Sequence, residues 1–283
     1  MRTTKCLRNK ILSFVLTLAM VITIFTVTAP EQVEAADKTL KGSGSSTVQF
    51  TDADCVDANG TVTHNIKYKA ANTGYVTIKF QSASQKYTSG YGYVTFCDKN
   101  KKTLGESEEV WSTAYKDSAY YTRTYGVKKG QTYFFKVKSY GGFKMTATSK
   151  TVKKSNGNSR QKAKSLTKGK NASGVIIAGD SKADWYKIKM TQSKKLKLTY
   201  SAKTNGDSSK YGIKVTFFDK NGKKWTSDSY NTMTTGNPKN GMDIYMYSNF
   251  GSKHSIPTGT YWVKVERASK QSSGYYNIKW STY

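Results

Sequence analysis

Beyond residue 36, short runs of alternating apolar and polar residues are separated by turn residues. In Asp184–Met190, for example, Tyr186, Ile188 and Met190 alternate with polar residues. A period of two is typical of a strand with one buried face. Turn pairs such as Asn221-Gly222 separate the runs. The pattern predicts an all-β protein of antiparallel β-sandwiches with a jelly-roll-like arrangement and no amphipathic helix.

Five of these runs occur twice, in the same order along the chain. Such a repeat predicts two tandem β-sandwich domains, at 36–150 and 155–283, with a polar linker at 151–154. The spacing between copies grows along the chain, as expected if loops absorbed the insertions. The paired runs are Ile66–Lys69 with Tyr186–Lys189, Tyr75–Phe80 with Lys195–Tyr200, Val94–Lys102 with Val215–Lys223, Thr132–Val137 with Thr260–Val265, and Gly141–Met145 with Gly274–Ile278.

The first 35 residues have the order of a secretory signal peptide. Met1–Lys10 is basic, Ile11–Ala29 is apolar, and Val33-Glu34-Ala35 has small residues at the positions that a signal peptidase reads. A retained membrane anchor is the alternative, because the apolar run is long enough to span a bilayer. The first interpretation predicts secretion, with no membrane span after cleavage.

Lysine dominates the charge of the chain. The net charge is +28, and without residues 1–35 it is +26, from 42 Lys and Arg against 16 Asp and Glu. Residues 151–283 hold 25 of these basic and 7 of these acidic residues, a net +18. Lysine is a hydrated point charge, so we expect diffuse attraction to anionic polymers and no specific nucleic-acid recognition. The alternative is that the lysines only solvate strand faces. The lysine-rich usage indicates a Gram-positive bacterium.

Two cysteines follow the predicted cleavage site, Cys55 and Cys97. In an oxidising compartment they are expected to form a disulfide. The repeat aligns Cys97 with Phe218, which indicates a packing position, whereas Cys55 has no clear counterpart.

The second half of the chain resembles the pre-peptidase C-terminal domain family of secreted bacterial peptidases. The resemblance implies a β-sandwich, and it extends to the first half only through the repeat. The matching residues are Asn156-x-Asn158-Ser159, Ala163, Leu166, Gly174, Asp184-Trp185-Tyr186, Asp219-x-Asn221-Gly222, Gly259-Thr260-Tyr261-x-Val263-x-Val265 and Gly274-x-Tyr276-x-Ile278.

The family is similar to collagen-binding modules, some of which hold calcium with carboxylates near the start of the domain. The resemblance implies Asn156, Asn158, Asp180 and Asp184 as the calcium positions here. Calcium prefers several carboxylates among six to eight oxygen ligands, and this set is poor in them. We therefore expect no cofactor and interpret Asn158 and Asp184 as turn-capping residues, with calcium binding as the less favoured alternative.

Residue types for catalysis are scarce. The chain has two histidines, His64 and His254, and neither a His-Glu-x-x-His nor a Gly-x-Ser-x-Gly stretch. No catalytic residue is predicted. Two acidic clusters are interpreted as solvated loops: Glu106, Glu108 and Glu109, and Asp52, Asp54 and Asp57.

Aromatic residues in polar stretches are the predicted binding residues, because exposed rings beside lysines suit ligand contact. Packing against edge strands is the alternative. We expect a secreted, non-catalytic binding or adhesion protein that recognises a glycan, a wall polymer, or a host matrix or immune protein, retained on the cell wall by charge. The alternative function is an accessory or inhibitory partner of a secreted hydrolase. The predicted binding residues are Trp111, Tyr115, Tyr120, Tyr121, Trp225, Tyr230 and Tyr245.

Overall fold

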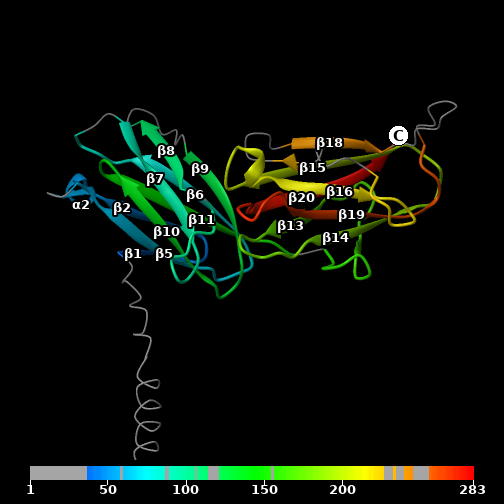
Figure 1. Cartoon of the computed structure of the whole chain (residues 1–283), viewed down its shortest axis with the longest axis horizontal. Coiled ribbons are helices and arrows are strands. Elements are labelled where there is room, and N and C mark those ends of the chain that lie inside the picture. The colour runs from blue at the N-terminus through cyan, green and yellow to red at the C-terminus, as the bar shows by residue number, and fades with distance from the viewer. Residues whose placement is uncertain are drawn as a thin grey trace, which may run out of the picture. The chain divides into compact units, whose positions relative to one another are not determined.

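The regular structure is almost entirely β-strand, which confirms the predicted all-β sandwich (Figure 1). Residues 36–283 form one compact unit, and the predicted signal peptide lies outside the described residues. In the described part of the chain, no helix has the length and apolar character needed to cross a membrane. The computed structural model describes residues 37–57, 60–86, 89–105, 107–113, 121–153, 156–225, 232–233, 239–244 and 255–283.

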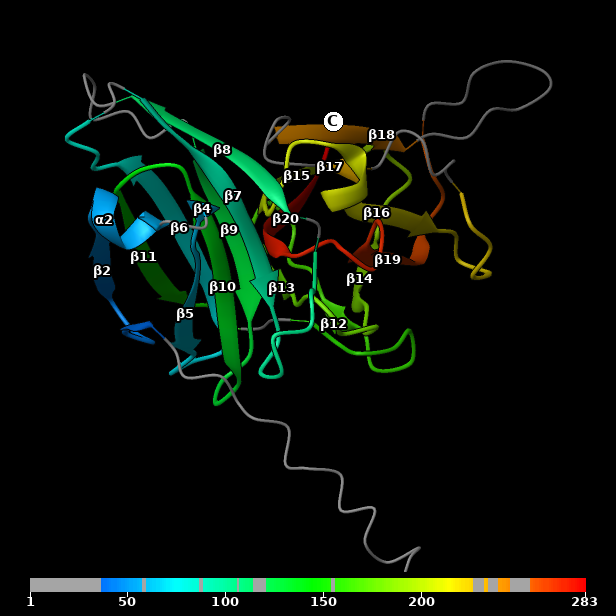
Figure 2. The same ribbon diagram turned by 60° about the vertical axis from the view of Figure 1, so that its left-hand side comes forward.

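Two sheets of the first half enclose a core (Figure 2). The alternation buries Val76, Ile78 and Phe80 on one face of the strand Gly74–Ser82, as predicted. One sheet has the order β1 (Lys38–Leu40), β5 (Thr63–Lys69), β10 (Thr132–Ser139), β7 (Ser89–Cys97), β8 (Glu108–Thr113). The other has the order β2 (Ser45–Phe50), β11 (Phe143–Thr151), β6 (Gly74–Ser82), β9 (Tyr121–Val127). The short helix α2 (Asp52–Cys55) and the pair β3 (Val56–Asp57) and β4 (Gly60–Thr61) follow β2.

The second half repeats this strand order around its own core. One sheet has the order β12 (Lys164–Ser165), β14 (Asp184–Met190), β19 (Gly259–Arg267), β16 (Ile213–Phe218), β17 (Thr232–Met233). The other has the order β13 (Ala172–Ile176), β20 (Gly274–Thr282), β15 (Leu196–Thr204), β18 (Lys239–Ile244), and one 3₁₀ turn spans Ser209–Tyr211. Repeated runs of the sequence therefore occupy corresponding places in the two sheet pairs.

The turns after β7 and β16 show this correspondence in detail. The Asp98 side chain accepts hydrogen bonds from the backbone N–H groups of Asn100 (2.9 Å) and Lys102 (3.0 Å). Asp219 does the same for the two equivalent residues, at 2.9 and 2.7 Å. The repeated Asp-Lys-Asn motif is thus a turn in which an aspartate satisfies the backbone. In each turn one residue has a left-handed backbone conformation. It is Lys101 (φ 59°) in the first turn and Gly222 (φ 81°) in the second.

The expected linker begins inside a strand, because β11 continues to Thr151. Val152 is buried, and its N–H donates to the carbonyl of Thr73 at 3.2 Å. This corrects the start of the linker at 151: the polar Thr and Lys residues near the end of β11 hid the strand. That residues 36–150 and 155–283 are independent domains stays a prediction.

Candidate functional site

The outer face of the β14–β19–β16 sheet carries three aromatic side chains. Tyr186 and its alternate neighbours point into the core, so Trp185 points outward. On β19, Trp262 lies opposite Phe218 of β16 and opposite Lys187 of β14. Side chains directly opposite each other in antiparallel strands share one face.

The aromatic rings of this face contact one another and the neighbouring cations. The rings of Trp185 and Phe218 have centroids 5.3 Å apart. The ammonium of Lys264 lies 5.9 Å from the Trp185 ring centroid, and the Arg160 guanidinium carbon lies 5.4 Å from that of Trp262. All three rings are half-buried, so each is held by its neighbours and still reaches solvent.

We call this surface the aromatic–lysine face. The acidic residue of this face, Glu266, forms an ion pair with Lys264. The other cations of the face keep a positive excess, which favours anionic ligands. The face consists of Arg160, Trp185, Lys187, Lys189, Phe218, Trp262, Lys264 and Glu266.

A cavity of about 620 Å³ lies at the start of β14. On its wall, Asp184 is buried and accepts hydrogen bonds from the Tyr276 hydroxyl (2.7 Å) and from the Asn156 Nδ2 amide. Burial raises the pKa of Tyr276 well above its usual value, so this hydroxyl stays a donor. The Oδ1 atom of Asn156 is buried and has no hydrogen-bond partner among the described residues. The lining residues are Asn156, Gly157, Asn158, Lys162, Lys164, Lys182, Ala183 and Asp184.

Three of the four predicted calcium positions, Asn156, Asn158 and Asp184, line this cavity. Asp180 is not among the lining residues, and its side chain accepts the N–H of Lys182 at 3.1 Å. The donor set does not fit calcium, because its one carboxylate already accepts two hydrogen bonds and three lysines surround it. Within the described ranges, no group of three or more His, Cys, Asp or Glu side chains is placed to hold a metal ion.

Of the predicted binding aromatics, one is buried and a second packs on a core while it remains half-buried. Tyr121 is buried, and its hydroxyl lies 2.8 Å from that of Tyr125. Trp225 packs on the core, with its ring 5.9 Å from that of Phe217. Tyr121 is therefore corrected from a surface ring to a packing ring, whereas the half-buried Trp225 stays a predicted binding position.

The remaining predicted aromatics give no site in the structure. Trp111 lies in β8 opposite Tyr91, and its side chain is outside the described part. Tyr115, Tyr120, Tyr230 and Tyr245 also lie outside the described residues. Sequence reasoning missed Trp185 and Trp262, although the alternation that placed Tyr186 and Val263 inward also placed these two tryptophans outward.

Cys55 and Cys97 are free and buried, so the expected disulfide is not formed. His64 contacts the residue before Cys55 and lies opposite Val137 of β10, whereas Cys97 lies opposite Phe134. This register separates His64, the neighbour of the Cys55 helix, from Cys97 by about 10 Å along the strands and about 10 Å across them. A disulfide requires Cα atoms less than about 7 Å apart, which corrects the pairing.

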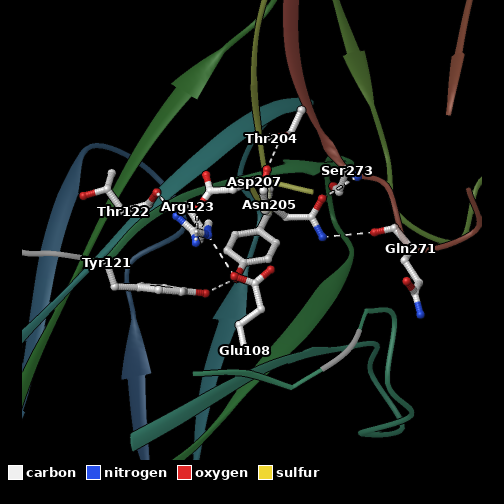
Figure 3. A network of polar contacts seen from close by, with 11 residues as sticks. Glu108, Tyr121, Thr122, Arg123, Thr204, Asn205, Asp207, Gln271 and Ser273 are labelled. Carbon is white, nitrogen blue, oxygen red and sulfur yellow. Dashed lines mark hydrogen bonds and ion pairs between the residues drawn. The ribbon is translucent and has the colours of Figure 1, made fainter. Parts of the chain in front are cut away.

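Two of the acidic residues interpreted as solvated loops, Glu108 (Figure 3) and Asp52, have structural partners, and Glu106 lies outside the described residues. Glu108 lies in β8 and pairs with Arg123 at 2.8 Å, and Arg123 also pairs with Asp207 of the second half at 2.8 Å. Burial raises the pKa of Glu108, and the Arg123 guanidinium opposes that rise. Asp52 accepts the N–H of Gly142 at 2.6 Å. Both carboxylates anchor neighbouring segments.

The chain was compared with known proteins. No protein-family model matches it, and no curated protein matches it. Among solved structures, the pre-peptidase C-terminal domain of collagenase from Bacillus anthracis is 12% identical, covers 41% of this chain and 90% of that domain, and has a TM-score of 0.26. A GH26-CBM35 β-(1,4)-mannanase from Podospora anserina is 13% identical, with 41% of this chain and 30% of that chain covered and a TM-score of 0.23.

The CUB1-EGF-CUB2 domains of rat MASP-1 are 7% identical, with 85% of this chain and 99% of that chain covered and a TM-score of 0.24. Likenesses at these values carry no functional argument.

Proposed function

We propose that residues 36–283 act outside the cell as a non-catalytic binding module that attaches to an anionic polymer through the aromatic–lysine face. The observation that carries this proposal is the set of half-buried rings of Trp185, Phe218 and Trp262 among outward-pointing cations. Rings that neighbours already hold lose little conformational freedom on binding, so the face is preorganised.

The two kinds of residue have complementary roles. Lysines such as Lys187 and Lys189 attract phosphate or carboxylate groups without demanding one fixed geometry, which suits a repetitive polymer. The rings provide flat apolar surface against which a sugar or polyol unit packs. The excess of charge in residues 151–283, +18 of the +26, supports this half as the stronger binder.

The test is retention of the 36–283 chain on an immobilised polyanion, poly(glycerol phosphate) or polyuronate, during a salt gradient. The double variant Lys187→Ala, Lys189→Ala removes two exposed lysines from the face. The matched control, Lys197→Ala with Lys203→Ala, removes two exposed lysines from β15 in the other sheet. Both variants lower the net charge equally.

We expect the face variant to elute at clearly lower salt than the control variant, because only the face contacts the polymer. Fragment 155–283 should be retained more strongly than fragment 36–150. Equal elution of the two double variants, or equal retention on a neutral polymer, would overturn the proposal.

A further inference from the structure

We infer that the cavity at the start of β14 binds an anionic group that carries a neighbouring hydroxyl, as in a polyol phosphate or a sugar acid. The inference rests on the proposed function for the identity of the polymer that supplies this unit. The cavity volume of about 620 Å³ is in the range of small-molecule sites.

The charge of the lining selects an anion. Lys162, Lys164 and Lys182 are exposed and line the cavity, against the single carboxylate of Asp184. Both oxygens of Asp184 accept hydrogen bonds from the protein, one of them from the buried Tyr276 hydroxyl. The lysine ammonium groups carry three donors each and accept nothing, so they suit phosphate or carboxylate oxygens.

The amide of Asn156 selects a hydroxyl. Its Nδ2 donates to the carboxylate of Asp184, and turning the amide over would bring two acceptors together. The orientation is therefore set, and Oδ1 is left as a buried acceptor without a donor from the described part of the chain. A carboxylate or phosphodiester brings acceptors only. A hydroxyl beside the anionic group supplies the missing donor.

The cavity is joined to the aromatic–lysine face by one segment of chain. Gly157 pairs with Trp185 through two backbone hydrogen bonds of 2.9 and 2.8 Å. Three residues farther on, Arg160 lies over the ring of Trp262, and Lys162 returns to the cavity. A polymer that crosses the face can therefore place one of its units in the cavity.

Two probes separate the sources of the anion: glycerol 3-phosphate and glucuronate. Their binding to the 36–283 chain is followed by NMR through the side-chain amide signal of Asn156 and by calorimetry. Inorganic phosphate, which lacks a carbon-bound hydroxyl, is the comparison. The double variant Lys164→Ala, Lys182→Ala removes two cavity lysines, and its matched control, Lys168→Ala with Lys170→Ala, removes two exposed lysines outside the lining.

We expect saturable binding of at least one hydroxylated probe, tighter than that of inorganic phosphate, with a shift of the Asn156 amide signal. The cavity variant should weaken binding about tenfold or more, and the control variant should change it less than about twofold. Preference for glycerol 3-phosphate would assign polyol phosphate, and preference for glucuronate would assign sugar acid.

The inference is overturned if neither probe shifts the Asn156 signal or if both double variants weaken binding equally. Such a result, together with polymer retention that still depends on Lys187 and Lys189, would leave the proposed function standing. If, in addition, polymer retention does not depend on Lys187 and Lys189, both proposals are overturned.

Discussion

The rings of Trp185 and Phe218 meet across an intervening strand, with centroids 5.3 Å apart. Their strands, β14 and β16, are both paired with β19 and not with each other. Strands separated by a third lie about 10 Å apart, so the two side chains lean toward each other over β19. The contact fixes one aromatic surface beside Lys264, which is the central part of the proposed binding face.

Replacement of Trp185 tests whether this contact serves binding as well as packing. In Trp185→Ala, we expect the free energy of unfolding to fall by about 1–2 kcal/mol and retention on the polyanion to weaken. Trp185→Phe should recover most of the stability and most of the retention, because it restores a ring that can contact Phe218. Denaturant titration and the salt gradient measure the two effects. Unchanged retention in a folded Trp185→Ala variant would argue against a role in binding.

Substitutions at the equivalent turn positions Lys101 and Gly222 should change the stability of the protein in opposite directions. Lys101 occupies a left-handed conformation at φ 59°, so Lys101→Gly should stabilise the protein by about 0.5–1 kcal/mol. Gly222→Ala should destabilise it by about 1–2 kcal/mol, since a side chain at φ 81° is strained. Lys102→Gly is the control and should not stabilise, because Lys102 has no positive φ. Chemical denaturation measures all three, and the same sign at Lys101 and Gly222 would refute the prediction.

The free cysteines predict two titratable thiols in the unfolded, non-reduced chain. In the folded protein, burial raises the pKa of the Cys55 thiol to about 11 and also raises that of Cys97. Alkylation at pH 8 should therefore be slow until the protein unfolds, because the thiolate is the reactive form. Mass spectrometry after alkylation with and without denaturant measures this. Recovery of an intact Cys55–Cys97 disulfide would contradict the separation of the two sites.

Asp52 predicts a loss of stability in acid. The hydrogen bond from the Gly142 backbone N–H lowers the pKa of Asp52 below 3.8, and that from Gln85 acts in the same direction. A carboxylate with a lowered folded pKa stabilises the protein above its unfolded pKa of about 3.9, and that stabilisation disappears as pH falls through the folded pKa. Asp52→Asn should thus be less stable than the parent at pH 7, and the difference should become smaller as the pH falls toward 2.

The measurement is denaturant unfolding of Asp52→Asn and the parent at both pH values. Asp98→Asn, in the turn after β7, is a useful comparison, because it also changes a carboxylate that accepts backbone hydrogen bonds. A difference between Asp52→Asn and the parent that is the same at pH 7 and pH 2 would show that the charge of Asp52 does not matter.

The isolated fragment 155–283 is predicted to fold, because its two sheets enclose their own core. It should be less stable than in the full chain, since it loses the Arg123–Asp207 ion pair and the hydrogen bond from the Gly126 N–H to the Ser273 hydroxyl (2.8 Å). Ala178 also packs with the core of the first half. Thermal or urea unfolding should show one cooperative transition. A gradual, non-cooperative change would mean that the halves do not fold separately.

The sequence by itself determined the local features of this protein. Alternation in Asp184–Met190 predicted a half-buried strand with Tyr186, Ile188 and Met190 inward, and the same alternation leaves Trp185 outward although it was not predicted as a binding residue. Turn pairs such as Asn221-Gly222 in the repeated runs predicted turns at corresponding points, and the structure shows that Asp98 and Asp219 cap these turns. These interactions depend on neighbours in the chain, so the order of residues is enough to predict them.

Only the tertiary structure decided which distant residues meet. Asn156 reaches Asp184, and Arg123 reaches both Glu108 and Asp207, through pairings that depend on strand order and register. The same pairings buried Tyr121, which the sequence placed on the surface, and separated Cys55 from Cys97. Register and sheet order are set by the sum of many non-local contacts, so no local pattern identifies the partner of a given side chain.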